Sequence, residues 1–271
     1  MPELAAAPTV AQVLRKATSV LGESDTPRLD AELLLASVLG VGRERLVTDA
    51  GTELDPDVVE RFDALVARRA AHEPVAYILG RKEFRRISLF VDRRVLVPRP
   101  ETELLVEVGL TLPRGASVVD VGTGSGAVAL ALKSERPDLS VWATDVSFDA
   151  LAVARENGLR LRVEVEFLQA DLLDGIDREF DAVLANLPYV AEGSSLPPDI
   201  GLYEPPLALF GGPDGLDPVR RLLEMTGRVP LIALEVGLPV AVDSLVRGAG
   251  FRSVERLRDL AGHERVVVAR R

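Results

Sequence analysis

The stretch Ser117–Leu132, SVVDVGTGSGAVALAL, joins an apolar run, a loop with three glycines and the start of an apolar helix. The valines of the run are typical of a strand buried on both faces of a parallel sheet. Glycine at 122, 124 and 126 permits backbone conformations closed to other residues and lets a ligand approach the main chain. The stretch therefore predicts a strand, a ligand-binding loop and a helix, and it also satisfies the G-x-G-x-x-A form of a dinucleotide fingerprint.

Strands and helices alternate from this stretch to the C-terminus. We expect helices at about 126–135, 147–158, 215–227 and 238–249, and strands at 117–121, 140–145, 163–168, 181–186, 229–236, 251–257 and 264–270. Repeated strand–helix units predict an α/β fold with a doubly wound, largely parallel sheet covered on both faces. The last two strands leave no room for a helix between them, so the final strand should be antiparallel to its neighbour.

Residues 1–80 have a purely helical pattern. Thr9 can cap a first helix, a second should run from Pro27 to Gly40, and Pro56 suits the first turn of a third. This part predicts a small helical bundle, and it carries no motif that would itself do chemistry. A hairpin or linker should follow, so the expected domains are 1–80, 81–100 and 101–271.

The segment 81–99 contains seven Arg or Lys residues and two acidic ones, a net charge of +5 in a chain whose net charge is −10. One interpretation is a solvated hairpin face, and the other is a contact for an acidic or RNA-bearing partner. The acidic balance of the whole chain argues against a general nucleic-acid binder, which normally has a basic footprint.

The composition of the 271 residues, 47% hydrophobic and 27% charged, is that of a globular protein. Cysteine is absent, which excludes disulfides and thiol chemistry, and His72 and His263 are the only imidazoles, so we expect no metal site. The first residues lack a basic region and a long apolar run, and no apolar run is long enough to span a membrane. We expect a cytoplasmic protein without a membrane segment.

An acid follows each of the next two predicted strands. Asp145 ends the second strand, 19 residues after Gly126, where a carboxylate can accept hydrogen bonds from both hydroxyls of a ribose. NAD and S-adenosylmethionine both contain such a ribose, so this feature does not choose between them, and Asp145 could instead cap a helix. Asp171 and Leu172 follow the third strand, where an acid could bind an adenine amino group and an apolar side chain could pack on the ring.

The fourth strand ends in Asn186-Leu187-Pro188-Tyr189. Pro188 restricts the backbone of Leu187 and so directs its carbonyl, and Tyr189 supplies a flat face. A primary amide could donate one hydrogen to the side-chain oxygen of Asn186 and one to the carbonyl of Leu187. Holding both hydrogens would aim a weakly nucleophilic nitrogen at an electrophile. The alternative is a turn with a local asparagine cap.

The order of glycine loop, acid-tipped second strand and Asn-x-Pro-Tyr resembles a class I S-adenosylmethionine-dependent methyltransferase, a Rossmann-like fold, acting on a planar nitrogen. Four further stretches are similar to the protein-(glutamine-N5) methyltransferases of peptide chain release factors, the HemK/PrmC family: EPVAYILGRKEF (73–84), VLVPRPETELLVE (95–107), YEPPLALFGGPDGL (203–216) and DLAGHERVVVAR (259–270). The resemblance covers nearly the whole chain.

The resemblance implies a site and a substrate. Its donor-binding positions match Gly122, Thr123, Gly124, Ser125, Gly126, Asp145, Asp171, Leu172 and Asn186. Its catalytic and substrate-binding tetrapeptide matches Asn186, Leu187, Pro188 and Tyr189. The implied substrate is the glutamine of the Gly-Gly-Gln motif of bacterial release factors, with the helical domain recognising the substrate, no reading of nucleic acid, and a monomeric enzyme.

Three positions near the expected site have a second interpretation. The family usually has proline where this chain has Leu187, but a main-chain carbonyl survives that change, so we expect activity to be retained. Pro100 in RPETE should begin a helix, and this segment is either purely structural or a wall of the donor pocket. Glu204, before two prolines, belongs either to a rigid lid loop that binds substrate or to a simple loop.

Rival functions remain open on the sequence. The same chemistry could act on an exocyclic amine of adenine or guanine, although the chain lacks a long basic insertion for reading nucleic acid. The glycine loop would also suit a nicotinamide-dependent oxidoreductase, although no acid–base pair is evident. A non-catalytic adaptor with the same fold is the third alternative.

Overall fold

The computed structural model describes residues 7–271, which divide into two compact units. The smaller unit comprises the residues up to Gly80 together with the segment Pro197–Tyr203. The larger unit comprises Arg81–Leu196 and Glu204–Arg271. Each unit has its own hydrophobic core and is described separately.

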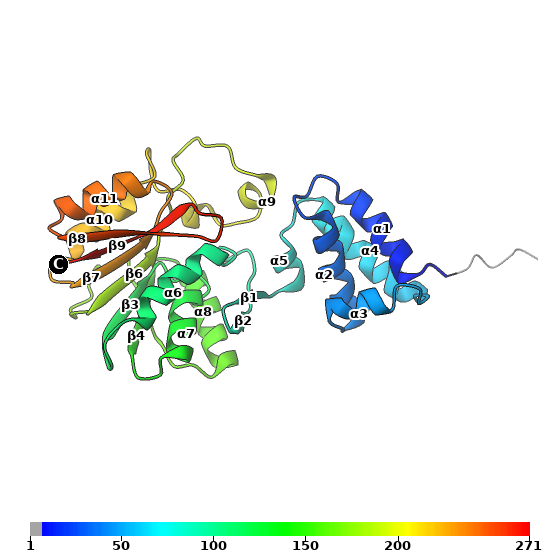
Figure 1. Cartoon of the computed structure of the whole chain (residues 1–271), viewed down its shortest axis with the longest axis horizontal. Helices are drawn as coiled ribbons and strands as arrows, with labels where there is room; N and C mark the ends of the chain where they lie inside the picture. Colours follow the sequence, from blue (N-terminus) through cyan, green and yellow to red (C-terminus); the bar gives the residue numbers. More distant parts are fainter. Residues whose placement is uncertain (1–6) are drawn as a thin grey trace, which may run out of the picture. The chain divides into compact units, whose positions relative to one another are not determined.

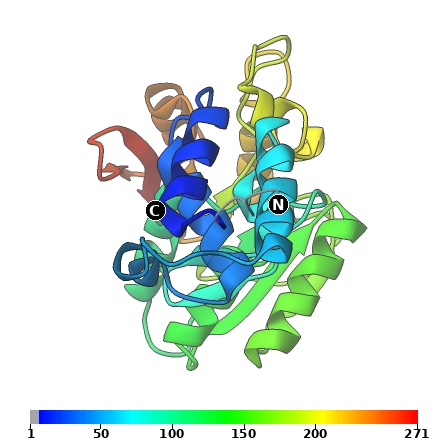
Figure 2. The ribbon, with the colours of Figure 1, turned by 90° about the vertical axis from the view of Figure 1, so that its right-hand side faces the viewer.

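The smaller unit is a helical bundle. Its elements are α1 (Val10–Val20), α2 (Pro27–Leu39), α3 (Arg43–Thr48), α4 (Pro56–Ala70), α5 (Val75–Leu79) and α9 (Pro198–Gly201). The expected N-terminal cap is confirmed, because the side chain of Thr9 accepts a hydrogen bond from the backbone N–H of Gln12. Gly40 ends α2 in a left-handed conformation with a φ of 66°. Figure 2 shows α1, α2 and α4 packed alongside one another, and their facing side chains bury Leu34, Leu35 and Phe62 completely.

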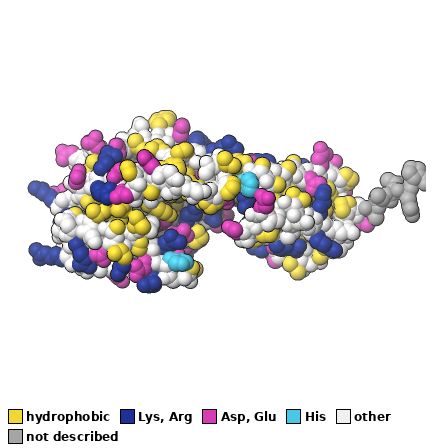
Figure 3. Space-filling view, turned by 90° about the horizontal axis from the view of Figure 1, so that it is seen from above, with side chains coloured by type: hydrophobic (Ala, Val, Ile, Leu, Met, Phe, Trp, Pro, Cys, Tyr) yellow, Lys and Arg dark blue, Asp and Glu magenta, His cyan; other side chains and the backbone are white. Residues whose placement is uncertain are grey.

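The expected hairpin is confirmed as β1 (Lys82–Phe84) and β2 (Ile87–Leu89), which are antiparallel. Arg85, in the turn, forms ion pairs with Glu107 and Glu135 of two helices of the larger unit. Arg94 and Arg99, further along, are paired with Asp92 and Glu204. At least three of the seven basic residues of 81–99 are therefore paired with acidic side chains of the same unit. On the face drawn in Figure 3, Lys and Arg side chains likewise stand close to Asp and Glu side chains.

The larger unit contains the predicted seven-stranded sheet, in the order β5-β4-β3-β6-β7-β9-β8. The strands are β3 (Ser117–Val121), β4 (Ser140–Asp145), β5 (Glu166–Gln169), β6 (Ala182–Asn186), β7 (Leu231–Glu235), β8 (Ser253–Arg258) and β9 (Glu264–Arg270). The first five are parallel, and β9 is antiparallel to both β7 and β8, as expected for the final strand.

Helices cover both faces of this sheet, as the alternating pattern predicts. They are α6 (Glu103–Leu110), α7 (Ala127–Glu135), α8 (Phe148–Leu161), α10 (Asp217–Met225) and α11 (Pro239–Gly248), with short 3₁₀ helices η1 (Pro100–Thr102) and η2 (Pro206–Ala208). In Figure 1, α6, α7 and α8 lie on one face of the sheet and α10 and α11 on the other. Pro100 therefore begins a helical segment, as expected, and that segment continues into α6.

The third strand begins later than the predicted 163–168. Helix α8 runs to Leu161 and ends at Arg162, which takes a left-handed conformation with a φ of 56°, and the N–H of Val163 still bonds the carbonyl of Gly158. Because these residues complete the end of the helix, the strand can start only at Glu166.

The winding of the chain sets where a ligand can bind. From β3 the chain runs outward through β4 to β5 and then returns to β6 on the other side of β3. In such a sheet, ligands bind beyond the carboxyl ends of the strands at this switch point. No helix within residues 7–271 combines the length and the apolar character needed to cross a membrane.

Candidate active site

A pocket of about 350 Å³ lies at the switch point, beyond the carboxyl ends of β3, β4 and β6. All of its lining residues belong to the larger unit and come from the segments 94–102, 120–128, 145–150, 170–172, 186–188 and 205–221. Among residues 7–271, no group of three His, Asp or Glu side chains is arranged to hold a metal ion.

The glycine loop forms the floor of the pocket. Gly122, Gly124 and Gly126 have φ values of 73°, 56° and 83°, a left-handed conformation that disfavours other residues. A Cβ at position 124 would have no heavy atom within 4 Å, so the main chain borders open space there. Thr123 and Ser125 also line the pocket. A ligand can therefore lie directly against this backbone.

Gly126 is the one residue of the predicted loop that does not line the pocket. It caps α7, and a Cβ at this position would lie 2.8 Å from Leu130 Cδ1 and 3.3 Å from Ala154 Cβ. The absence of a side chain at Gly126 therefore lets the first turn of α7 pack closely against α8.

Asp145 ends β4 with its carboxylate at the pocket. Its Oδ2 accepts a hydrogen bond from the N–H of Gly124, and its Oδ1 accepts one from the N–H of Ser147, both at 2.9 Å. Burial raises the pKa of Asp145, and these backbone N–H groups oppose the rise. Because a carboxylate offers about four lone-pair positions, both oxygens can still accept a further hydrogen bond from a ligand hydroxyl.

Asp120 supports the glycine loop from below, a role the sequence reasoning missed. It is buried, and its Oδ2 accepts hydrogen bonds from the hydroxyl of Thr123 at 2.6 Å and from the N–H of Ala129 at 3.2 Å. Burial raises its pKa to about 6. The available signal was an acid inside an otherwise apolar strand, which must find polar partners.

Asp171 and Leu172 both reach the pocket, as expected for the residues after the third strand. The carbonyl of Leu172 accepts a 2.8 Å hydrogen bond from the hydroxyl of Thr144, which fixes this turn against β4. The carboxylate of Asp171 is paired at 2.7 Å with Arg221 from α10, a second lining residue that the sequence reasoning missed.

The tetrapeptide after β6 is divided between the pocket and the protein interior. Asn186, Leu187 and Pro188 line the pocket, whereas Tyr189 does not. The ring of Tyr189 packs against Gly237, where a Cβ would lie 2.9 Å from the ring, and burial raises the pKa of its hydroxyl. The side chain of Leu187 covers Gly122, since a Cβ there would lie 3.2 Å from Leu187 Cδ2.

The segment PRPETE forms part of the pocket wall, because Pro98, Arg99 and Thr102 line it. Thr102 is buried, and its Oγ1 accepts a 3.2 Å hydrogen bond from Nδ2 of Asn186. Arg99 forms a 2.7 Å ion pair with Glu204, which is buried and does not itself line the pocket. Glu204 thereby ties the loop that follows it, beginning with Pro205, to this wall.

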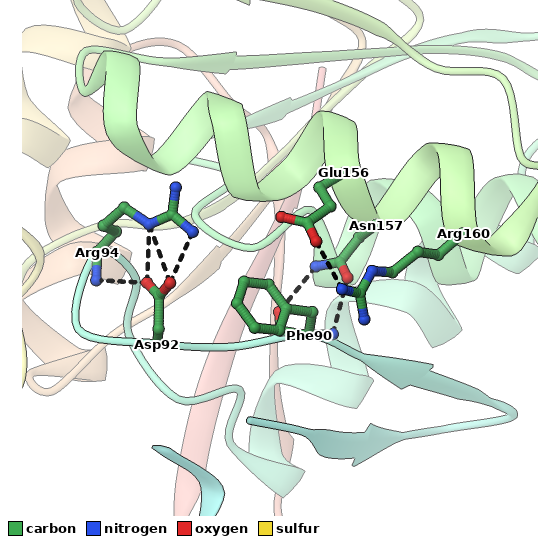
Figure 4. Close-up of polar contacts among 6 residues, drawn as sticks. All are labelled: Phe90, Asp92, Arg94, Glu156, Asn157 and Arg160. Atoms are coloured by element: carbon green, nitrogen blue, oxygen red, sulfur yellow. Dashed lines mark hydrogen bonds and ion pairs between the residues drawn. The ribbon is translucent and has the colours of Figure 1, made fainter. Parts of the chain in front are cut away.

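Asn157 of α8 joins the segment after β2, at Phe90, to the glycine loop, and Figure 4 shows its contact with Phe90. Its Nδ2 donates 2.9 Å hydrogen bonds to the carbonyls of Phe90 and Ser125, and its Oδ1 accepts a 2.7 Å bond from the N–H of Phe90. Asn157 is fully buried, so these partners satisfy an otherwise costly polar group. The guanidinium of Arg160 stacks on the Phe90 ring, 4.8 Å from its centroid.

The pocket therefore offers four groups: the exposed backbone of the glycine loop, the carboxylate of Asp145 for vicinal hydroxyls, the apolar Leu172 beside the acid Asp171, and Asn186. The first three groups suit a nucleoside, and Asn186 lines the same pocket. S-Adenosylmethionine fits this set of groups, because its ribose hydroxyls and its adenine need partners of these kinds.

Comparisons with known proteins identify both units. A family model described as the PrmC N-terminal domain matches residues 12–80, and one described as the methyltransferase small domain matches residues 100–198. A release factor glutamine methyltransferase of Caulobacter vibrioides is 41% identical over 258 residues, covering 90% of this chain and 89% of that protein. The protein of the same name from Escherichia coli is 36% identical over 268 residues, covering 95% of this chain and 97% of that protein.

Solved structures share the fold. A methyltransferase from Pyrococcus furiosus has a TM-score of 0.52 with 20% identity, covering 67% of this chain and 87% of that chain. The T. thermophilus 16S rRNA N2 G1207 methyltransferase in complex with AdoMet and guanosine has a TM-score of 0.51 with 16% identity, covering 70% of this chain and 49% of that chain. At these identities the likeness concerns the fold alone, that of class I methyltransferases.

Proposed function

The chain belongs to the release factor glutamine methyltransferase family, and from this premise we propose how its pocket holds donor and substrate. The enzyme uses S-adenosylmethionine to methylate the side-chain amide of a glutamine in a release factor. Family membership favours this function over the alternatives of a nucleic-acid amine methyltransferase and a nicotinamide-dependent oxidoreductase.

Different residues of the pocket would bind different parts of the methyl donor. Asp145 would accept hydrogen bonds from the ribose hydroxyls, Asp171 from the adenine amino group, and Leu172 would pack on the adenine ring. The glycine loop, with Thr123 and Ser125, would border the methionine end. The geometry that supports this assignment is the open space beside Gly124 and the direct bond from its N–H to Asp145. When bound, the donor supplies an electrophilic methyl group on a sulfonium centre.

Asn186 and Leu187 would hold the substrate amide. The side-chain oxygen of Asn186 and the carbonyl of Leu187 accept one amide hydrogen each, while Pro188 keeps the direction of that carbonyl. An amide nitrogen held by both hydrogens has its remaining face directed into the pocket. It would form the new C–N bond as the S–CH₃ bond of the donor breaks, and it would release one proton to the solvent. Positioning and electrostatics supply the acceleration, without an acid–base pair. Tyr189, which packs behind the pocket lining, would support the backbone of Asn186 and Leu187. Glu204 would hold the loop that borders the substrate.

The finer properties of the reaction are also proposals. We assign the target to the glutamine of the Gly-Gly-Gln motif and recognition of the release factor to the helical domain 1–80, joined through 81–100 to the catalytic domain 101–271. We expect a monomer that works in the cytoplasm, where translation terminates, and that does not read nucleic acid. Substitutions on the exposed face of the helical domain should raise the KM for the release factor without changing the affinity for the donor.

Methyl transfer from radiolabelled S-adenosylmethionine tests the function. A release factor, the same factor with its Gly-Gly-Gln glutamine changed to alanine, rRNA and DNA are offered separately to the full-length enzyme. Label should enter only the unaltered release factor. Label in the altered factor would move the target to another residue, and label only in nucleic acid would overturn the proposed substrate.

A further inference from the structure

A buried carboxylate that the proposed mechanism does not use stands beside the catalytic asparagine. Glu235 ends β7 and is the direct partner of Asn186 in the parallel pairing of β6 with β7, so the two side chains leave the sheet on the same face. Glu235 is only 2% exposed, and it does not line the pocket. Any influence of this carboxylate on the substrate must therefore pass through a neighbour.

Thr102 is that neighbour. Its hydroxyl lowers the pKa of the Glu235 carboxyl group, against the larger effect of burial, which raises it. Within the described residues, neither carboxylate oxygen has a hydrogen-bond partner of standard geometry. The same hydroxyl oxygen accepts the 3.2 Å bond from Nδ2 of Asn186. Thr102 thus lies between the buried acid and the asparagine.

The Thr102 hydroxyl can donate only one hydrogen bond, and the acceptor of that bond decides how the Asn186 amide is oriented. If Thr102 donated to Oδ1 of Asn186, the NH₂ group of Asn186 would face the pocket. A substrate amide also presents its NH₂ group there, so two donors would face each other and no hydrogen bond could form. If Thr102 donates to a carboxylate, its oxygen must instead accept from Nδ2, and Oδ1 of Asn186 is left facing the substrate.

We propose that Glu235 is a positioning residue, whose carboxylate accepts a hydrogen bond from the Thr102 hydroxyl and thereby turns the oxygen of Asn186 toward the substrate amide. The inference rests on the proposed function of Asn186 and extends it by two residues. The buried carboxylate is an acceptor only, which is the property that the orientation requires. An unpaired carboxylate in this position costs stability, so its value lies in the orientation it imposes.

Ionisation of Glu235 makes the orientation depend on pH. Burial raises the pKa of Glu235 to about 7, the nearby Glu101 raises it further, and Arg265 of β9 and Arg99 lower it. The charge of this carboxyl group in turn raises the pKa of the Tyr189 phenol, in addition to the larger effect of burial. Once protonated, Glu235 can donate to Thr102, which frees the threonine proton to bond Oδ1 of Asn186. The kcat should therefore fall as the pH decreases through about 7.

Two isosteric variants test the proposal, Glu235→Gln and Thr102→Val. Each should lower the kcat for release-factor methylation about 10- to 100-fold, the range expected for losing one hydrogen bond to a charged group. The affinity for S-adenosylhomocysteine should change less than about 2-fold, and the double variant should be no worse than the poorer single one, because both changes break one chain of bonds. Thr102→Ser keeps the hydroxyl and should restore most of the kcat.

Glu255→Gln, the same change at an exposed position of β8, is the matched control and should leave the kcat unchanged. The decisive readout is the pH profile: the decline of kcat below about pH 7 should be present in the parent enzyme and absent from Glu235→Gln and Thr102→Val. A merely structural role would not remove it. If Glu235→Gln fails to fold, Thr102→Val gives the same readout.

The outcomes separate this inference from the proposed function. A parent enzyme that methylates no release factor would refute the function. A parent enzyme that does so, with normal kcat and an unchanged pH profile in Glu235→Gln, would refute the positioning role of Glu235 alone. Additive losses in the double variant would show that the two residues act separately and would also overturn it.

Discussion

The carboxylate of Glu235 should measurably destabilise the fold, and replacing it with glutamine tests this at a single atom. Burial raises the pKa of Glu235 from its ordinary 4.5 to about 7. Each tenfold change in proton affinity is equivalent to about 1.4 kcal/mol, so the deprotonated side chain costs the folded protein about 3 kcal/mol above pH 7. Against the typical stability of about 5–15 kcal/mol, this is a large penalty.

The sign follows from proton binding. The folded protein holds this proton more tightly than the unfolded chain, so the free energy of unfolding falls as the pH rises from about 4.5 to about 7, and it stays low above that. Glutamine cannot ionise, so the variant lacks this contribution. Asp120, whose pKa burial raises to about 6, is present in both proteins and cancels from their difference.

Urea unfolding at pH 5, 6, 7 and 8, without donor, measures the effect. Relative to the parent, Glu235→Gln should gain about 2.5 kcal/mol between the lowest and highest pH, while Glu255→Gln should gain nothing. A difference between parent and Glu235→Gln that stays constant over this range would show that the carboxyl group ionises normally in the folded protein. Burial would then not raise the pKa of Glu235.

Three other substitutions address the rest of the site. Asn186→Ala should lower kcat about 100- to 1000-fold, as expected for losing a group that holds the reacting atoms, with little change in S-adenosylhomocysteine affinity by calorimetry; an unaltered kcat would remove Asn186 from its role. Asp145→Asn should weaken S-adenosylhomocysteine binding about 10-fold or more, because a carboxylate accepts stronger hydrogen bonds than an amide; calorimetry showing equal affinity would contradict the ribose assignment. Asn157→Leu removes three hydrogen bonds of a fully buried side chain, so urea unfolding should show a loss of about 3 kcal/mol, and donor binding should weaken as the glycine loop at Ser125 loses its connection to Phe90; unchanged stability would show that other contacts hold this loop.

Most of the fold could be predicted from local patterns. The strands at 117–121, 140–145 and 264–270 appear with the predicted bounds, because runs of valine and alanine between glycine, proline and polar residues leave few alternatives. The third strand was misplaced, because the left-handed end of α8 at Arg162 has no glycine to mark it. An unusual conformation adopted by an arginine leaves no trace in the sequence pattern.

The sequence also led to the glycine loop, Asp145 and the Asn-Leu-Pro-Tyr tetrapeptide, since each stands at the end of a predicted strand. It did not reveal that Gly126 and Tyr189 lie outside the pocket lining. Local patterns show neither that the backbone at Gly126 packs between two helices nor that the Tyr189 ring turns into the interior. Asp120, Asn157 and Glu235 were missed as well. They sit within helices and strands, where polar residues are usually assigned to a solvated face.

The sequence by itself determined the order of strands and helices and the chemical groups at the strand ends, because hydrophobic periodicity and glycine positions are local properties. Only the tertiary structure decided which polar groups meet: Asn157 with Phe90, 67 residues apart, Asn186 with Thr102, 84 apart, and Arg99 with Glu204, 105 apart. A buried polar group must form a hydrogen bond with a partner that the folded chain brings within about 3 Å. The order of the strands in the sheet determines which partner that is.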